Sequence, residues 1–252
     1  MERPPFERRS SAKQNRLSLF SRASNTHEHN FKGYERIVGF DTMPDAESTV
    51  SGTASYTLQM KAKEYTRTKH TRTFMCAVDA TEASEPALEW IMENLVDDGD
   101  EVVAVRVLDY EEEPIIDQKK AREAANNLLS AIVELNRASG DERKISITVE
   151  FMSGDIKSTI LHMVRVYRPE SLTIGTRGKQ VSTLEKMLGT TPIGNLSKQL
   201  IWQCPVPVII VRPEDRIQKH LIKRLTDPRR HEYADIVKDD PTLPMRRSSG
   251  SP

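Results

Sequence analysis

Glycine and hydroxyl residues in the segment 171–212 have a spacing that suits phosphate binding. An apolar run ending at Ile174 predicts a buried strand, and Gly175 and Gly178 allow the backbone to turn sharply beyond its end. Gly189-Thr190-Thr191-Pro192 then opens a helical pattern, with a hydroxyl that can cap the helix and a proline suited to its first turn. Two glycine turns near one helix N-terminus predict backbone amides that point at an anion.

Asp79 is the second candidate for chemistry. It follows another apolar run and is expected at the carboxyl edge of a sheet, where open α/β sheets bind ligands. The alternative is that Asp79 merely ends a strand or caps the helix that begins near Ser84 or Glu85. Arg177 and Lys179 add cationic donors beside the glycines, or are ordinary solvated loop charges. The carboxyl ends of parallel strands share one edge, so Asp79 and the glycine turns together favour a binding site.

No catalytic constellation accompanies these residues. The glycine segment matches neither Gly-x-x-x-x-Gly-Lys-Ser/Thr nor the dinucleotide pattern Gly-x-Gly-x-x-Gly. His27 and His29 are the neighbouring histidines, and such a pair without further ligands is more often a solvated loop than a metal site. With no general base, metal-ligating carboxylate pair or nucleophile evident at the binding edge, the sequence favours binding over catalysis and predicts no metal site.

Composition narrows the class of protein. The 252 residues are 37% hydrophobic and 6% aromatic, which fits one domain with long polar flanks. The 37 basic residues balance the 37 acidic ones, so nucleic acid is not the default partner. Cys76 and Cys204 cannot form a disulfide framework and indicate a reducing, intracellular compartment. No apolar run reaches the length of a membrane helix, so we expect a cytoplasmic protein without membrane contact; a nuclear or mitochondrial location is an alternative.

The flanks differ from the centre of the chain. Residues 1–32 are rich in Arg and Ser and are expected to be disordered, and residues 214–252 form a hydrophilic tail in which 217–225 could make a short amphipathic helix. Residues 33–71 contain two strand-like pieces that would either add an edge strand or wrap the core. Ser11 and Ser249 each follow paired arginines, which suits a basic-directed kinase or is a chance match.

Between these flanks, strands and helices alternate regularly. The predicted strands are 73–78, 102–108, 145–151, 172–174 and 206–211. The predicted helices are 83–95, 117–137, 156–167 and 192–203. This alternation implies an α/β fold with a parallel sheet covered by helices on both faces.

Several of these segments resemble one known family. FMCAVDATEASEPALEW, VVAVRVLDY, the turn Ser153-Gly154-Asp155, and IGTRG with LGTTPIGNLSKQLIWQCPVPVIIVRP are together similar to a universal stress protein domain over residues 72–213. YERIVGFDT and the long flanks resemble the fungal members. The resemblance implies a Rossmann-like, adenine nucleotide alpha hydrolase-like fold with five parallel strands, usually dimeric.

One branch of that family binds nucleotide, and the resemblance implies where it would bind here. Adenine would lie against Ala77 and Asp79, with Val107 on the neighbouring strand. The phosphates and ribose would meet the glycine segment: Gly175, Thr176, Arg177, Gly178, Gly189, Thr190 and Thr191. Ten residues separate the second and third glycines where the family pattern has nine. One extra residue costs little closure entropy, although it can displace the backbone amides by a residue's length. Because the rest of the pattern is kept, ATP, with or without Mg²⁺, is the favoured ligand.

The resemblance also implies that the last strand, 206–211, pairs with its copy in a homodimer. Its apolar edge would be a liability in a monomer. Alternatively the segment 34–60, or the helix beginning near Ile217, covers this edge within one chain. The resulting hypothesis is a dimeric, ATP-binding regulatory module of the stress response whose flanks are phosphorylated and whose signalling partner is unknown. The alternatives are a slow ATPase that uses the same site and an interaction scaffold that binds no nucleotide.

Overall fold

The computed structural model describes residues 31–41, 55–79, 84–109, 118–139, 143–176 and 195–212, together with 217–218, 221–222 and 226. The chain divides into two compact units, Met1–Val211 and Arg212–Pro252. In the second unit Ile217, Gln218, Leu221 and Ile222 are helical, and the amide of Thr226 donates to the carbonyl of Ile222 (3.0 Å).

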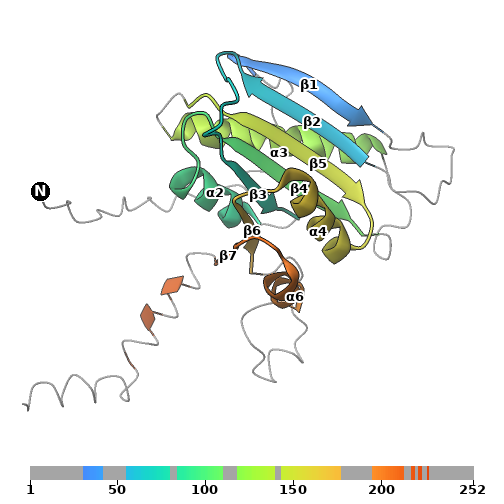
Figure 1. Cartoon of the computed structure of the whole chain (residues 1–252), viewed down its shortest axis with the longest axis vertical. Helices are drawn as coiled ribbons and strands as arrows, with labels where there is room; N and C mark the ends of the chain where they lie inside the picture. Colours follow the sequence, from blue (N-terminus) through green and yellow to red (C-terminus); the bar gives the residue numbers. More distant parts are fainter. Residues whose placement is uncertain are drawn as a thin grey trace, which may run out of the picture. The chain divides into compact units, whose positions relative to one another are not determined.

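Seven strands in the described residues form one sheet in the order β1-β2-β5-β4-β3-β6-β7 (Figure 1). They are β1 (Tyr34–Asp41), β2 (Ser55–Ala62), β3 (Thr73–Ala77), β4 (Glu101–Leu108), β5 (Ser146–Ser153), β6 (Ser171–Gly175) and β7 (Val208–Val211). The five strands from β3 to β7 run parallel, as the alternation of strands and helices predicts. The fold class is therefore confirmed.

The prediction of five strands is wrong, because the segment before β3 belongs to the sheet. β1 and β2 pair with each other, and β2 pairs with β5, in antiparallel fashion. The two strands extend the sheet at the end opposite β7. They therefore do not cover the edge of β7, which excludes one of the two alternatives considered for that edge.

Helices cover both faces of the sheet, and two apolar clusters fill the space beneath them. α2 (Glu85–Asn94) and α3 (Gln118–Ala138) pack on one face, where helix residues such as Leu88 and Leu129 share a buried cluster with Phe151 of β5. α4 (Ile156–Tyr167) and α6 (Asn195–Gln203) pack on the other, through residues such as Val164 and Leu200. Figure 1 shows α3 and α4 on opposite sides of the strands. The apolar side chains of α3 recur at helical spacing, which is why this long helix can bury one stripe and expose the other.

A buried carboxyl ties the added strands to α4. Glu150 of β5 is 6% exposed and lies opposite Thr57 of β2, whose hydroxyl donates to Glu150 Oε2 (2.7 Å). The hydroxyl of Tyr167, at the end of α4, donates to Glu150 Oε1. Burial raises the pKa of Glu150, and the two hydrogen bonds oppose this only in part. β5 thus presents apolar residues to α3 and a polar group to the opposite face.

We expect the stability contribution of Glu150 to depend on pH. Its pKa in the folded chain is above its ordinary 4.5, so the folded state keeps a proton that the unfolded state releases. Stability is therefore lost as the pH rises from 4.5 through the folded pKa, by at most about 1.4 kcal/mol per pH unit. Glu150→Gln removes this titrating group. The free energy of unfolding of the variant, measured with urea, should therefore rise relative to that of the wild type as the pH increases. Glu35→Gln, at an exposed position on β1, is the matched control. A difference between Glu150→Gln and wild type that is constant with pH would contradict the assignment.

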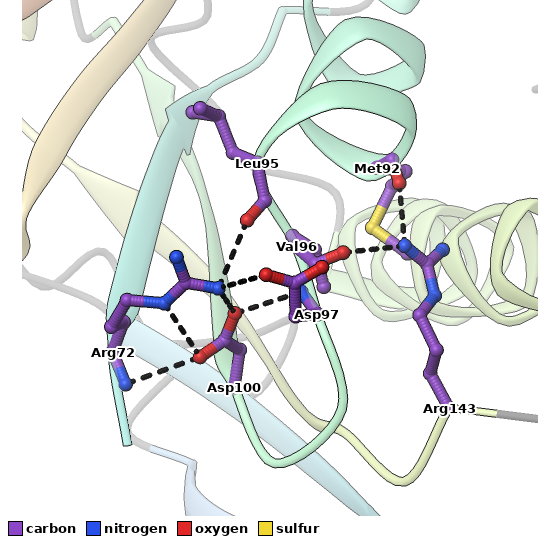
Figure 2. Close-up of polar contacts among 7 residues, drawn as sticks. All are labelled: Arg72, Met92, Leu95, Val96, Asp97, Asp100 and Arg143. Carbon is purple, nitrogen blue, oxygen red and sulfur yellow. Dashed lines mark hydrogen bonds and ion pairs between the residues drawn. The ribbon is translucent and has the colours of Figure 1, made fainter. Parts of the chain in front are cut away.

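Two arginines from distant segments close the end of α2 at the amino edge of the parallel strands (Figure 2). A helix leaves its last carbonyls without partners, and α2 has no basic residue in its last turn. Arg143 donates through Nη1 to the carbonyls of Met92 (2.7 Å) and Val96 (2.6 Å), and Arg72 donates to the carbonyl of Leu95 (3.3 Å). Arg72 is in turn held by Asp100, which raises its pKa further. This network fixes the scaffold at the edge opposite the candidate site.

Candidate functional site

The strand order reverses at β3, which creates a topological switch point at the carboxyl edge. From β3 the chain passes to β4 and β5 on one side, and then returns to β6 and β7 on the other. In open α/β sheets the crevice at such a point is where ligands bind. The residues that follow β3 and β6 are therefore the first to consider, and these are Asp79 and Thr176.

The strand register aligns the ends of the three strands that carry candidate residues. Ala77 of β3 pairs with Val105 of β4 on one side and with Ile174 of β6 on the other. β3 ends at Ala77 and β6 ends at Gly175, so Asp79 and Thr176 follow at the carboxyl edge, where Val107 lies near the end of β4. The sequence-predicted residues Asp79, Val107 and Thr176 are therefore at the same edge of the sheet.

The candidate residues at this edge combine two apolar and two polar side chains. Ala77 and Val107 are half-buried and pack against the cluster beneath α4 and α6. Asp79 is half-buried and Thr176 is 3% exposed. A small apolar surface beside a carboxylate suits a flat, nitrogen-rich ring better than a hydrated ion.

Local contacts hold Asp79 in place. The amide of Val78 donates to the carbonyl of Val105 (2.9 Å), which continues the β3–β4 pairing up to Asp79. The hydroxyl of Ser84 donates to the carbonyl of Asp79 (3.1 Å), and Ser84, not Asp79, is the N-cap residue of α2. Ser84 makes no side-chain capping bond, so its hydroxyl serves the chain leaving β3 instead.

β4 also ends at this edge, and its end is fixed by a turn after β5 that we did not predict as part of the site. The amide of Gly154 donates to the carbonyl of Leu108 (3.0 Å), and Asp155 accepts from the amide of Ser158 (2.8 Å) at the start of α4. That hydrogen bond lowers the pKa of Asp155. The sequence places this turn at Ser153-Gly154-Asp155, and an Asp before a helical pattern is an N-cap signal, but neither observation assigns the turn to the site. The turn positions Val107 by holding the residue next to it.

Much of the predicted phosphate segment lies outside the described residues. Gly175 is half-buried at the end of β6, opposite Val211, and Thr176 follows it. The remaining predicted residues fall in the undescribed segment 177–194: Arg177, Gly178, Gly189, Thr190 and Thr191. The nucleotide-site assignment of all ten residues therefore stays a prediction, for which the described part supplies Ala77, Asp79, Val107, Gly175 and Thr176 at one edge.

Residues 70–212 match the model of the universal stress protein family. The chain belongs to this family. The matched region begins just before β3 and ends just after β7, so it coincides with the parallel part of the sheet. β1 and β2 are additions to that domain.

This universal stress protein is also similar to a universal stress protein A family protein of Schizosaccharomyces pombe, with 34% identity over 203 residues. The alignment covers 79% of this chain and 63% of the relative, so the chain spans less than two thirds of that protein. The aligned region is longer than the family domain and therefore includes part of the flanks.

Two solved universal stress proteins are among the structures to which this chain is similar. A protein from Arabidopsis thaliana with AMP bound is 20% identical, over 57% of this chain and 94% of that one, with a TM-score of 0.40. A protein from Archaeoglobus fulgidus in complex with dAMP is 18% identical, over 55% and 96%, with a TM-score of 0.39.

In the part of this universal stress protein that the structure describes, no three His, Cys, Asp or Glu side chains are grouped to hold a metal ion. Cys76 and Cys204 are not in a disulfide, and burial raises the pKa of the Cys76 thiol to about 12. A thiol with so high a pKa is a poor nucleophile. No described helix is both long and apolar enough to cross a membrane.

Proposed function

We propose that this universal stress protein binds an adenine nucleotide, ATP with Mg²⁺ in the first instance, at the carboxyl edge of β3, β4 and β6. The observation that carries the proposal is the row of Ala77, Val105 and Ile174 at the switch point, beyond which Asp79, Val107 and Thr176 follow at the same edge of the sheet. Adenine would lie on Ala77 and Val107, whose half-buried apolar atoms it would remove from water. The Asp79 carboxylate would accept a hydrogen bond from the 6-amino group of the base.

The phosphates would then extend from Thr176 toward the glycine segment. Backbone amides in a glycine-rich turn can approach phosphate oxygens closely, and the helical pattern that follows adds the positive end of its dipole. Arg177 would supply a charged donor. Gly178, Gly189, Thr190 and Thr191 complete this proposed loop, which has one residue more between Gly178 and Gly189 than the pattern of the family's nucleotide-binding branch.

Calorimetric titration of the full chain with ATP and Mg²⁺ tests the proposal. We expect a dissociation constant on the order of 1 µM, about −8 kcal/mol. Asp79→Ala and Gly178→Val should each weaken binding at least about tenfold, because the first removes an acceptor for the base and the second obstructs the amide loop. Asp97→Ala is the matched control, since Asp97 is an exposed aspartate at the opposite edge of the sheet.

The alternatives predict different results in the same titration. Absence of binding by the folded wild-type chain would contradict the proposal and leave an interaction scaffold. Binding accompanied by release of inorganic phosphate would identify a slow ATPase at the same site. Equal affinity for ATP and AMP would show that the β- and γ-phosphates, which the glycine segment is proposed to hold, add nothing to binding.

We also propose that the protein is a homodimer paired through β7. The two edge strands of the sheet, β1 and β7, differ in how well they are protected against pairing with a strand of another chain. β1 carries exposed Glu35 and Arg36, and its register with β2 shifts between Val38 and Phe40, features that discourage edge-to-edge pairing. β7 consists of Val-Ile-Ile-Val without charge or irregularity, and within the described residues it pairs only with β6. Pairing with its copy would satisfy this edge.

The role that we propose for the dimer is regulatory, in the cytoplasm and in response to stress. Nucleotide occupancy would stabilise the folded chain by mass action and so report the nucleotide supply. Phosphorylation at Ser11 and Ser249, which lie outside the described residues, would change the charge of the flanks. This role rests on family membership and on the paired arginines before each serine.

A further inference from the structure

The second compact unit, Arg212–Pro252, carries two exposed large hydrophobic side chains in a helical stretch. They are Leu221 (38% exposed) and Ile222 (60%). Ile217 and Gln218 are also helical, and the amide of Thr226 donates to the carbonyl of Ile222 (3.0 Å), which is the spacing of an α-helical hydrogen bond. Single exposed aliphatic side chains need no explanation, but these two belong to a wider pattern.

The sequence around them has the periodicity of an amphipathic helix. Residues 216–225 include four large apolar side chains and no acidic one: Ile217, Leu221, Ile222 and Leu225. At 3.6 residues per turn, these four positions fall within one sector of about 140°. Apart from Gln218, the remaining positions are all basic: Arg216, Lys219, His220, Lys223 and Arg224. The pattern therefore predicts a helix with one apolar side and one cationic side.

Signals for both ends of a helix flank this segment in the sequence. Glu214 and Asp215 precede it, and acidic residues favour a helix N-terminus. Lys223 and Arg224 lie near its end, where cations complement the helix dipole, and Pro228 stops a helix shortly beyond. A helix of this length is marginal in water by itself, so burial of its apolar side would stabilise it.

We propose that residues 216–225 lie as an amphipathic helix on the surface of an anionic phospholipid membrane. The apolar side would enter the boundary between headgroups and acyl chains, while the cations stay at the level of the lipid phosphates. Such binding is independent of the nucleotide site proposed above. It replaces the expectation of a protein without membrane contact, which considered only runs long enough to cross a membrane. No described helix can cross one, but a helix on the surface needs only one apolar side.

A lipid surface suits this segment better than a groove on another protein. Protein interfaces depend on a few large anchors, among which Trp and Tyr are prominent, and residues 212–232 contain no Phe, Trp or Tyr. The aliphatic side chains of this segment offer little shape for a partner to recognise. A membrane requires no such shape. Four Lys and Arg side chains on one helix match the cation clusters that bind acidic lipids, and their charge complements that of the membrane.

Flotation of the full chain with lipid vesicles tests the proposal. One set of vesicles is phosphatidylcholine alone, and the other contains roughly a third phosphatidylserine, whose negative charge attracts Lys and Arg. We expect binding to the anionic vesicles, and binding at least about tenfold weaker to the neutral ones. Raising the salt concentration from about 0.1 M to about 1 M shortens the screening length from about 10 Å to about 3 Å and should release most of the bound chain.

A paired lysine substitution measures the contribution of charge. Lys219→Gln together with Lys223→Gln should weaken binding to the anionic vesicles about 25-fold, which is about fivefold for each cation. Lys69→Gln together with Lys119→Gln is the matched control, because it changes the net charge equally at two exposed lysines of the first unit. The control should bind as the wild type does.

Leu221→Ser measures the contribution of the apolar side. It should weaken binding to the anionic vesicles about tenfold, the effect of keeping one leucine side chain out of an apolar environment. Leu196 on α6 has nearly the same exposure, 37% against 38% for Leu221, so Leu196→Ser is the matched control and should leave binding unchanged. Circular dichroism checks that both variants are folded.

Gln218 allows a gain of binding to be tested as well. Helical spacing places Gln218 within the apolar sector, between the positions of Leu225 and Ile222. Gln218→Leu would complete the apolar side and should strengthen binding about tenfold. Gln203→Leu, at an exposed glutamine on α6, adds the same side chain elsewhere and should have no effect.

Three outcomes would overturn the proposal. The first is that the full chain does not bind anionic vesicles; if it then bound calmodulin with Ca²⁺, whose groove receives basic amphipathic helices, the partner would be a protein instead. The second is vesicle binding that neither Leu221→Ser nor the lysine pair changes, which would place the contact elsewhere in the chain. The third is binding that depends on the lysines but not on Leu221→Ser or Gln218→Leu, which would indicate a basic tail held by charge alone. None of these samples contains nucleotide, so their failure is separate from failure of the nucleotide proposal.

Discussion

Asp100→Ala is expected to lower the free energy of unfolding by about 3 kcal/mol, although Asp100 lies far from the candidate site. Its carboxylate is buried, with 4% of the side chain exposed, and accepts from Arg72 Nε (3.1 Å), Arg72 Nη2 (2.5 Å) and the amides of Arg72 (3.3 Å) and Asp97 (2.8 Å) (Figure 2). Alanine would leave all these donors without their acceptor. The expected loss of about 3 kcal/mol is at the lower end of the range for buried ion pairs. The Arg72 side chain is 41% exposed, so water can replace part of the hydrogen bonding that Asp100 provides.

Asp97→Ala is the control that distinguishes the effect of removing a buried carboxylate from the effect of removing a negative charge near Arg72. Asp97 also pairs with Arg72 Nη2, at 2.7 Å, but its side chain is 79% exposed. Its loss should cost less than about 1 kcal/mol and should matter less still at high salt, whereas the effect of Asp100→Ala should persist. Urea unfolding followed by circular dichroism measures both. If the two variants were equally destabilised, the network would act by surface charge alone.

The pair also shows why sequence reasoning stopped short at this edge. Gly99-Asp100 predicts a turn, and the turn exists, but the partner of Asp100 lies 28 residues earlier at Arg72. No local pattern joins an arginine before one strand to an aspartate before the next. The same limit applies to Arg143, whose acceptors Met92 and Val96 lie in and just after α2, about 50 residues earlier in the chain.

The parallel strands were predictable because their signals are local. Continuous apolar runs gave β3, β4 and β6 close to their observed bounds, and the helical spacing of apolar residues gave α3 and α4. The partner of β1 and β2 was not predictable in this way. In β5, however, apolar residues such as Val149 alternate with Thr148 and Glu150, and this period of two indicates a strand with one apolar and one polar face. That pattern was the available sign that β5 is not an ordinary buried strand.

The candidate site was predictable to the same extent. Strand order and register, which follow from the β/α alternation, bring Asp79, Val107 and Thr176 to the same edge of the sheet. The turn after β5 was not assigned to the site, because its role depends on a contact with the end of β4. The amide of Gly154 reaches the carbonyl of Leu108 only in the folded sheet.

Gly154→Ala is therefore expected to have a large effect, lowering the free energy of unfolding by about 2–4 kcal/mol. Gly154 has φ +151°, a conformation that residues with a side chain rarely adopt, and a Cβ there would lie 2.8 Å from Thr159 Oγ1. Any shift of the turn would be passed to the end of β4 and so to Val107. Nucleotide affinity should fall together with stability, measured by calorimetry and urea unfolding on the same samples.

A double-mutant cycle separates the two causes of this effect. Thr159→Ala removes the oxygen that the new Cβ would strike, so adding it to Gly154→Ala should recover the steric part of the loss and leave the cost of the backbone conformation. Thr159→Val keeps an atom in that place and should recover nothing. If both second substitutions behaved alike, the loss would come from the backbone conformation of Gly154 alone. The requirement for glycine would then be set by how the chain leaves β5, not by how α4 packs against it.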